Sequence, residues 1–347
     1  MGTLRVKGII ELEQFWPKGE ADADTTKIQL VVKGGSFEYK EDGAAKFKKT
    51  NAFKDAKSVG QVSKEVIKTR AKDGVQTITV RLQGVDAPEL HYKAAPLKQS
   101  DSITKTKRAG FNKINKEEKR QHFAESASVA LAAHLKSFAN GKATISAVFE
   151  SKVEKPFEAI DTYGRFIGNV LVGNGKDINL WLVENGWCSP AFYTSMKPEE
   201  INTFLTAWAK GKKIKGRTSQ SISTNASKFD WKLIYRKPST VKKFTIGEDK
   251  GPSIMPKIFR RQVAWAVAKK AGIANTSKNF KGHLQKTPDQ LMLLKDFLQD
   301  GLTAGKMHAL HEFVDAKGKI LEAPEQLVFQ EKPGTLLNKN GKKITAW

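Results

Sequence analysis

The stretch VRLQGVDAPE, residues 80–89, holds three charged side chains that suit chemistry on an anion. Arg81 stands five residues before Asp86 and eight before Glu89. Two carboxylates can hold a cation while a guanidinium holds an anionic substrate, which is the arrangement that metal-assisted catalysis needs. The alternative at this point is a solvated turn with a surface salt bridge.

Two further segments carry charged residues in predicted turns. The segment DADT, residues 22–25, follows Pro17 and Gly19. Its two carboxylates are either ligands or only turn-forming residues, since Asp favours turns through its own backbone hydrogen bonds. The segment DTYGR, residues 161–165, ends in Arg165. Arginine suits a phosphoryl group because its planar fork makes bidentate hydrogen bonds and stays charged at working pH.

Strands and turns must position these residues. Ile78, Val80 and Leu82 alternate with polar residues, which predicts a strand that breaks at Gly84. Apolar patterns predict further strands and helices, the strands over 3–15, 27–32, 144–149 and 166–172 and the helices over about 118–139, 178–185 and 198–211. Five strands with a helix between the third and the fourth predict an α+β fold built on an OB-fold five-stranded Greek-key barrel.

Two lysine-rich insertions interrupt this pattern. We expect residues 34–75 to have some structure of their own and much of residues 93–120 to be flexible. If the insertions fold beside the charged residues, they extend a track for phosphates. The alternative is that both are solvated surface loops.

The charge of the chain favours a nucleic-acid partner. Sixty Lys and Arg against 36 Asp and Glu give a formal net charge of +24, and neutralising phosphates releases condensed counterions. We find neither a strongly basic amphipathic helix for a membrane surface nor the ~18 consecutive apolar residues of a membrane span. The start of the chain has no signal-peptide core, and the single cysteine, Cys188, excludes an internal disulfide. We therefore expect a cytoplasmic protein.

Residues 3 to about 215 resemble the staphylococcal nuclease (thermonuclease) family. The resemblance rests on the three segments 22–25, 80–89 and 161–165, which occur in the family's order. It implies a calcium-dependent nuclease that hydrolyses phosphodiester bonds of DNA or RNA with low sequence specificity. The chief alternative is a catalytically silent OB-fold protein that binds nucleic acid. A third is a metal-dependent regulator that binds a protein partner.

The resemblance assigns the metal ligands and the base. Asp24, Asp86 and the backbone carbonyl of Ala87 are the expected ligands of Ca²⁺, which prefers hard oxygen donors. Glu89 is the expected general base, or at least the residue that positions the attacking water.

The resemblance also assigns the groups that contact the substrate. Arg81 and Arg165 are expected to clamp the phosphate and the charge that develops on it. Tyr163, Phe192 and Tyr193 are the expected substrate-binding aromatics, and the alternative for the last two is packing in the core. Family positions held here by Thr162 and Thr194 depart from the usual pattern, which bears on affinity for nucleotide ends.

The sequence indicates three regions. Residues 1–216 form the nuclease-like domain, 217–255 a basic linker with a strand near 229–235, and 256–347 a small α+β module. In this module we expect a helix over 256–271, a helix that opens at Thr287 and Pro288 and ends before Gly301, and a hairpin around Asn340 and Gly341.

The C-terminal module resembles no family known to us. We expect it to dock nucleic acid, to form an oligomer contact or to bind a protein partner. A metal site at His308 and His311 is disfavoured, because the sequence offers no clear fourth ligand.

Overall fold

The computed structural model divides the chain into two units. Unit 1 comprises residues 1–83, 129–182 and 331–347, and unit 2 comprises 84–128 and 183–330. The residues described are 1–19, 21–32, 36–60, 63–97, 103–222, 233–235, 244–273, 277–286, 288–331 and 334–345. Both units combine segments that are far apart in the sequence. The boundaries predicted at 216/217 and 255/256 stay predictions.

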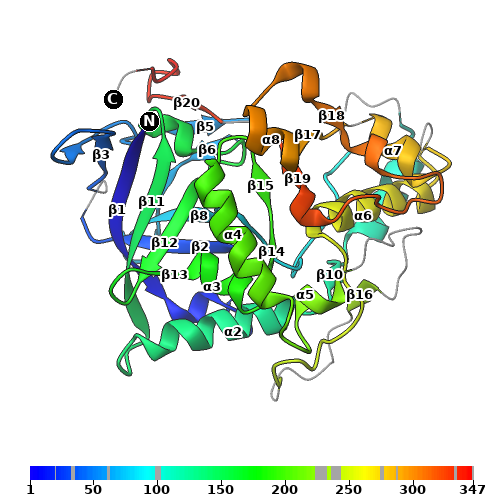
Figure 1. The fold of residues 1–347 in the computed structure, drawn as a ribbon, viewed down its shortest axis with the longest axis horizontal. Coiled ribbons are helices and arrows are strands. Elements are labelled where there is room, and N and C mark those ends of the chain that lie inside the picture. The colour runs from blue at the N-terminus through cyan, green and yellow to red at the C-terminus, as the bar shows by residue number, and fades with distance from the viewer. Residues whose placement is uncertain are drawn as a thin grey trace. The chain divides into compact units, whose positions relative to one another are not determined.

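Unit 1 contains a closed five-stranded barrel (Figure 1). Its strands are β1 (Gly2–Glu11), β2 (Thr25–Leu30), β8 (Gln76–Leu82), β11 (Thr144–Val153) and β12 (Phe166–Val172). The order is β11-β12-β8-β2-β1, and β1 pairs again with β11 to close the barrel. Strands β8 and β12 are parallel, whereas the other neighbours are antiparallel. The predicted α+β fold with an OB-type barrel is confirmed.

Alternating side chains fix the register of the barrel. In β8, Ile78, Val80 and Leu82 are buried while the residues between them are partly exposed. Burying one such side chain contributes roughly 1.5–3 kcal/mol. A slip by one residue would exchange all three for polar side chains. Because these three side chains point into the core, Arg81 lies on the opposite face of β8.

The first insertion packs against the barrel within unit 1. Its strands are β3 (Glu38–Glu41), β4 (Lys48–Lys49), β5 (Lys57–Val59), β6 (Lys64–Glu65) and β7 (Ile67–Thr69). The rings of Phe37 and Phe53 lie 5.4 and 5.0 Å from the ring of Phe166, centroid to centroid. The expectation that this insertion has structure of its own is confirmed.

The end of the chain also belongs to unit 1. Strand β20 (Thr335–Leu337) pairs with β5 of the first insertion. The backbone N–H of Ile344 donates to the carbonyl of Leu336 at 2.9 Å, and Gly341 has a φ of +76° in the turn between them. The predicted hairpin is therefore present.

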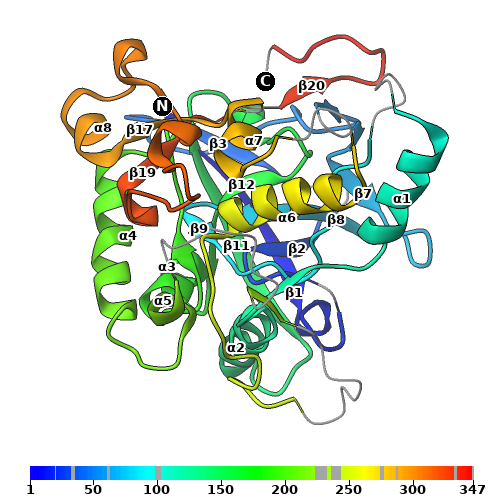
Figure 2. The ribbon, with the colours of Figure 1, turned by 90° about the vertical axis from the view of Figure 1, so that its right-hand side faces the viewer.

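Unit 2 has its core around helix α6 (Pro256–Lys270). Phe259 and Val263 of α6 share a buried cluster with Phe111 of α1 (Lys105–Asn115). Figure 2 shows α1 near one end of α6. Helix α1 lies in the second insertion, so residues 105–115 are helical, and the expected flexibility of much of this insertion stays a prediction. Burial of Phe111 explains the helix, since the other side chains of α1 are polar or partly exposed.

Short sheets and helices complete unit 2. One sheet has the order β15-β19-β17-β18, and two-stranded sheets join β9 to β14 and β10 to β16. The strands are β9 (Val85–Asp86), β10 (Arg120–Gln121), β14 (Ser189–Pro190), β15 (Phe192–Tyr193), β16 (Ile234–Tyr235), β17 (Gln290–Leu293), β18 (His308–Ala309) and β19 (Leu327–Phe329). The helices, apart from α1 and α6, are α4 (Pro198–Gly211), α5 (Thr218–Ser221), α7 (Phe280–Lys286) and α8 (Leu294–Asp300).

Several predicted helices differ at their starts. Helices α2 (Ala124–Ser137) and α3 (Ile178–Glu184) run across the boundary between the units in sequence, and α2 begins six residues later than predicted. The helix predicted from Pro288 is wrong over 290–293. These residues form β17, because Leu291 and Met292 are buried in a strand that has neighbours on both sides. Thr287, the predicted cap, lies outside the described residues.

The predicted strand near 229–235 is described only from residue 233 onward, where Ile234 and Tyr235 pair with β10. Over the described ranges of the chain, no helix is long and apolar enough to cross a membrane.

We expect a protein of residues 1–216 alone to lose cooperative folding. Ala94 and Phe111 would lose their core partners on α6. The free energy lost by exposing such a core exceeds the free energy of unfolding of most domains. Circular dichroism during thermal unfolding of the 1–216 protein and of the full chain measures this. A cooperative transition of the shorter protein at the temperature of the full chain would contradict the expectation and support the boundary at 216.

Candidate functional site

The predicted site residues are divided between the two units. Unit 1 contains Asp24, Arg81, Tyr163 and Arg165, and unit 2 contains Asp86, Ala87, Glu89, Phe192 and Tyr193.

In unit 1 the barrel register brings Asp24 and Arg81 together. Antiparallel pairing of β2 with β8 places Thr25 opposite Arg81, and the backbone N–H of Leu82 donates to the carbonyl of Asp24 at 2.9 Å. Nη1 of Arg81 then forms an ion pair with Oδ1 of Asp24, and their side chains are 14% and 3% exposed. The hydroxyl of Thr25 donates to the same carboxylate oxygen at 3.1 Å. Asp24 is thus a buried carboxylate whose charge Arg81 balances.

A turn closed by Asp161 holds Arg165. Oδ1 of Asp161 accepts the backbone N–H groups of Tyr163 at 2.9 Å and Arg165 at 2.8 Å, while Oδ2 accepts Nε–H of Arg165 at 2.7 Å. Gly164 has a φ of +69°, a conformation that glycine adopts without strain. Arg165 directly precedes β12, whose parallel register pairs Ile167 with Arg81. Arg81 therefore lies on one strand of the barrel and Arg165 lies in the turn that leads into the neighbouring strand.

Tyr163 and a lysine of the first insertion flank this turn. The ring of Tyr163 lies 5.1 Å from the guanidinium carbon of Arg165 and is 41% exposed. The side chain of Lys64, on β6, lies close to Gly164. A Cβ built on Gly164 would lie 3.0 Å from Cε of Lys64. Burial lowers the pKa of Lys64; Lys68 and Arg165 lower it too, while Asp161 raises it. The insertion thus adds positive charge beside Arg165.

In unit 2 helix α6 holds Asp86 and Glu89. The backbone N–H of Lys257 donates to Oδ2 of Asp86 at 3.2 Å, and both terminal nitrogens of Arg260 lie 3.4 Å from Oδ1 of Asp86. Nη1 of Arg260 also forms an ion pair with Oε1 of Glu89. Lys257 lies in the first turn of α6, so Asp86 also meets the positive end of the helix dipole.

Burial and the neighbouring charges shift the pKa values of Arg260 and Lys257 on α6. Burial lowers the pKa of Arg260, but the carboxylates of Asp86 and Glu89 outweigh burial and keep the pKa well above its usual value. Burial also lowers the pKa of Lys257 to about 8, with Asp289 opposing the change and the neighbouring arginines adding to it. Arg260 is therefore a permanent cation between the two carboxylates.

The loop that carries Asp86 and Glu89 is fixed at several points. The backbone N–H of Glu89 donates to the side-chain oxygen of Gln121 at 3.0 Å, and the hydroxyl of Ser189 donates to the carbonyl of Asp86 at 3.1 Å. Gly84, which opens the loop, has a φ of +75°, and a Cβ there would lie 2.5 Å from the ring of Phe204. Glycine is therefore required at this position both by conformation and by space.

The predicted aromatic residues of unit 2 pack inside the protein. Phe192 is fully buried in β15, where it pairs with Val328 of β19. It has no exposed face for a base, so core packing, the alternative reading, describes Phe192 in this structure. Tyr193 is partly buried, with its ring 6.5 Å from that of Phe329 and 5.6 Å from Nζ of Lys257.

The predicted ligands have the donor atoms that calcium prefers. Two carboxylates and a backbone carbonyl are hard oxygen donors of the sort that Ca²⁺ prefers. However, among the described residues no group of three or more His, Cys, Asp and Glu side chains is placed to hold a metal ion, and this includes His308 and His311. Arginines of the chain hold both Asp24 and Asp86. A divalent cation would therefore have to compete with these arginines.

Sequence reasoning missed Arg260 and Lys64. One signal in the sequence points to Arg260: two adjacent arginines stand in a predicted helix whose other positions are largely apolar. Arginines buried in such a helix need acidic partners. Nothing in the sequence indicates which acids those partners are. Lys64 is one of many lysines in its insertion.

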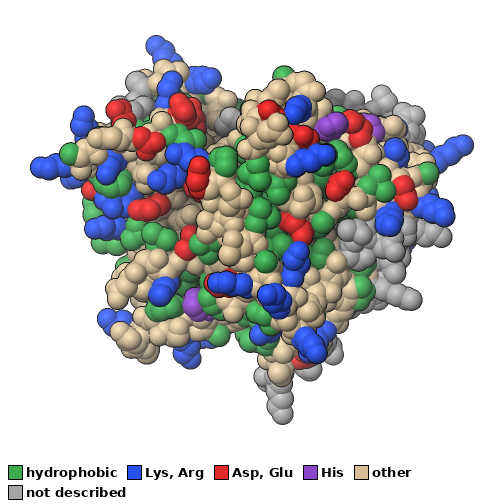
Figure 3. All heavy atoms as spheres, in the orientation of Figure 1, with side chains coloured by type: hydrophobic (Ala, Val, Ile, Leu, Met, Phe, Trp, Pro, Cys, Tyr) green, Lys and Arg blue, Asp and Glu red, His purple; other side chains and the backbone are tan. Residues whose placement is uncertain are grey.

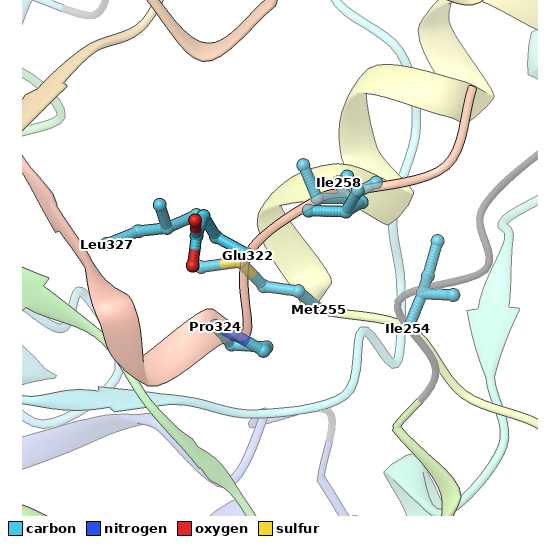
Figure 4. A pocket seen from close by; sticks show the side chains of 7 residues that line it. Ile254, Met255, Ile258, Glu322, Pro324 and Leu327 are labelled. Atoms are coloured by element: carbon cyan, nitrogen blue, oxygen red, sulfur yellow. The ribbon is translucent and has the colours of Figure 1, made fainter. Parts of the chain in front are cut away.

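A small apolar pocket also lies in unit 2 (Figure 4). Six of its seven lining side chains are apolar and Glu322 is the seventh, the others being Ile254, Met255, Ile258, Ile320, Pro324 and Leu327. It contains none of the predicted site residues.

The central part of the chain matches one protein-family model. The family model described as "Staphylococcal nuclease homologue" matches residues 79–217. The matched segment contains Arg81, Arg165 and the carboxylates Asp86 and Glu89, while Asp24 and α6 lie outside it. A search of curated proteins finds no match.

Asn179 ties together the strands that position the two arginines. It is fully buried in unit 1, where its side-chain N–H groups donate to the carbonyls of Gln83 at 2.9 Å and Gly168 at 3.1 Å. Its side-chain oxygen accepts the backbone N–H of Val170 at 3.2 Å. These bonds fix the end of β8 against β12.

We expect Asn179→Ala to lower the free energy of unfolding by about 2–4 kcal/mol, because it leaves several buried backbone groups unsatisfied. Urea denaturation measures the change, and Asn202→Ala on the exposed face of α4 is the control, expected within about 0.5 kcal/mol of the unchanged protein. Equal effects of the two substitutions would contradict this role.

Proposed function

We propose that the protein is a calcium-dependent nuclease, because residues 79–217 match the family model of staphylococcal nuclease homologues. It hydrolyses phosphodiester bonds of DNA or RNA with low sequence specificity. The observation that carries the proposal is the position of Arg81 on β8 and of Arg165 directly before β12, the parallel neighbour of β8 in an OB-type barrel. Both lie in the matched segment, as do Asp86 and Glu89.

Arg81 and Arg165 are the proposed clamp for the phosphate. A phosphodiester is anionic, so attack on it requires that its charge, and the charge added in the transition state, be offset. A guanidinium does so with two parallel hydrogen bonds. Each preorganised donor of this kind is typically worth about 3–4 kcal/mol of the barrier. Tight bonding of Arg165 to Asp161 supports such preorganisation.

Glu89 is the proposed base, taking a proton at its carboxylate from the attacking water. We propose Asp24, Asp86 and the carbonyl of Ala87 as ligands of calcium, which when bound offsets substrate charge and orients water. Tyr163 is the proposed contact for the substrate's end, and its 41% exposure supports that role. Tyr193 is proposed as a second, weaker contact.

A specific observation favours a second candidate, a barrel that binds nucleic acid without cleaving it. Arg260 forms ion pairs with both Asp86 and Glu89, so a guanidinium already occupies the position beside the two carboxylates that a metal ion would take. The two candidates differ in turnover and not in binding. The expected cytoplasmic setting and a protein partner for the C-terminal region remain predictions.

The positive charge supports nucleic acid as the ligand in both cases. The net charge is +24. On the face drawn in Figure 3, Lys and Arg side chains stand among Asp and Glu side chains rather than in one uninterrupted patch. On this face, contacts to phosphates therefore depend on local groups of cations.

Cleavage of single-stranded DNA tests the nuclease directly. We expect calcium to support cleavage and a chelator to abolish it. We expect Arg165→Ala to lower the rate by about 10²–10³-fold and Glu89→Gln by about 10²–10⁴-fold. Arg70→Ala is the control, since this exposed arginine pairs with Asp73 on the surface. Absence of cleavage of both DNA and RNA by the unchanged protein at roughly micromolar concentration would favour the silent barrel.

Binding in chelator separates affinity from cleavage. We expect the affinity for single-stranded DNA to fall steeply between about 50 and 200 mM salt, because phosphate contacts release counterions. Lys64→Gln should reduce the slope of log K against log salt by about 0.7, the value for one contact to a single strand. Fluorescence anisotropy measures both, with exposed Lys176→Gln as the control. A slope unchanged by Lys64→Gln but changed by Lys176→Gln would place the contact elsewhere.

A further inference from the structure

Helix α6 engages Asp86 and Glu89 through two separate groups. The backbone N–H of Lys257 donates to Oδ2 of Asp86 at 3.2 Å, while Arg260 lies 3.4 Å from Oδ1. Arg260 also forms an ion pair with Glu89. Both oxygens of Asp86 and one oxygen of Glu89 thus have partners on one helix.

Burial makes the cation between these carboxylates a requirement. The side chains of Asp86, Glu89 and Arg260 are 1%, 13% and 26% exposed. Two carboxylates so close together and so far from water cannot both stay ionised without a positive charge beside them. A divalent cation can meet this requirement, and in this structure a guanidinium does.

Arg260 comes from outside the segment that the family model matches, which ends at residue 217. The guanidinium between the carboxylates is therefore supplied by the C-terminal region of this chain. The adjacent Arg261 does not share this role, since it binds Asp289 with Nε at 2.8 Å and Nη2 at 2.7 Å.

We propose that Arg260 competes with a divalent cation for the position beside Asp86 and Glu89. The position beside the two carboxylates is taken either by the Arg260 guanidinium or by the cation, because a guanidinium and a divalent ion repel each other at this range. The choice of calcium as that cation rests on the proposed function, whereas the competition rests on the contacts of Arg260.

The two contacts from α6 differ in how they can be broken. The Arg260 side chain is long and about a quarter exposed, so it can rotate into water. The N–H of Lys257 belongs to the helix backbone and stays in place. Entry of a cation therefore requires displacement of the Arg260 side chain only, while α6 keeps its hold on Oδ2 of Asp86.

Calorimetric titration of the full chain with calcium, without nucleic acid, tests the competition. We expect Arg260→Gln to bind calcium more tightly than the unchanged protein, on the order of tenfold, since it removes a partly exposed positive charge from the site. We expect Arg260→Lys to lie between them, because lysine keeps the charge and loses the fork. Arg261→Gln, which removes the same charge at the next position, should leave the affinity unchanged.

Thermal unfolding with and without calcium checks the same point and shows that each variant folds. Removing Arg260 takes away the guanidinium that both buried carboxylates contact, so calcium should raise the Tm of Arg260→Gln more than that of the unchanged protein. If Arg260→Gln does not fold, Arg260→Lys carries the comparison.

Equal calcium affinities of Arg260→Gln and the unchanged protein would overturn the competition, as would an equal gain in Arg261→Gln. If the unchanged protein cleaves DNA in that case, the proposed function stands and only this inference fails. If no variant binds calcium and none cleaves DNA, the proposed function fails as well.

Discussion

A carboxylate removed from water must have a cation or several hydrogen-bond donors beside it, and the chemically interesting parts of this protein follow from that constraint. Asp24 meets it with Arg81, and Asp161 meets it with Arg165 and two backbone N–H groups. Asp86 and Glu89 meet it with Arg260. In each case the acid orients an arginine as much as the arginine neutralises the acid.

The surrounding strands, turns and helix fix the positions of these acid–arginine pairs. Burial of Ile78, Val80 and Leu82 sets the register of β8, and the register puts Arg81 opposite Thr25, next to Asp24. Gly84 allows the chain to turn against Phe204 where a side chain would not fit. In unit 2 the core cluster around Phe259 fixes α6, and α6 in turn presents Arg260 to the acids.

Local patterns in the sequence predicted what local physics determines. The alternation of β8 and the apolar face of α4 gave the right elements, because period and caps act within a few residues. The helix predicted from Thr287 and Pro288 was wrong at its start, since the short apolar run over 291–294 is equally compatible with a buried strand. The Arg260 contacts were out of reach, because they join residues 171 and 174 positions apart. The motif around Asp86 and Glu89 identified the acids, but only tertiary structure shows which cation neutralises them.

The same pairing constraint limits what each arginine can do for a substrate. An arginine that binds an acid through a terminal nitrogen of its fork binds phosphate with that nitrogen only at the expense of the pair, unless another cation takes over the acid. For Arg81, a cation at Asp24 would supply that replacement, so cation and phosphate would favour each other's binding. Arg165 needs no such exchange, because Asp161 holds it through Nε and the fork of a guanidinium has further donors. Under the proposed function, Arg165 would therefore account for binding without metal, and Arg81 would join it only when the cation is present.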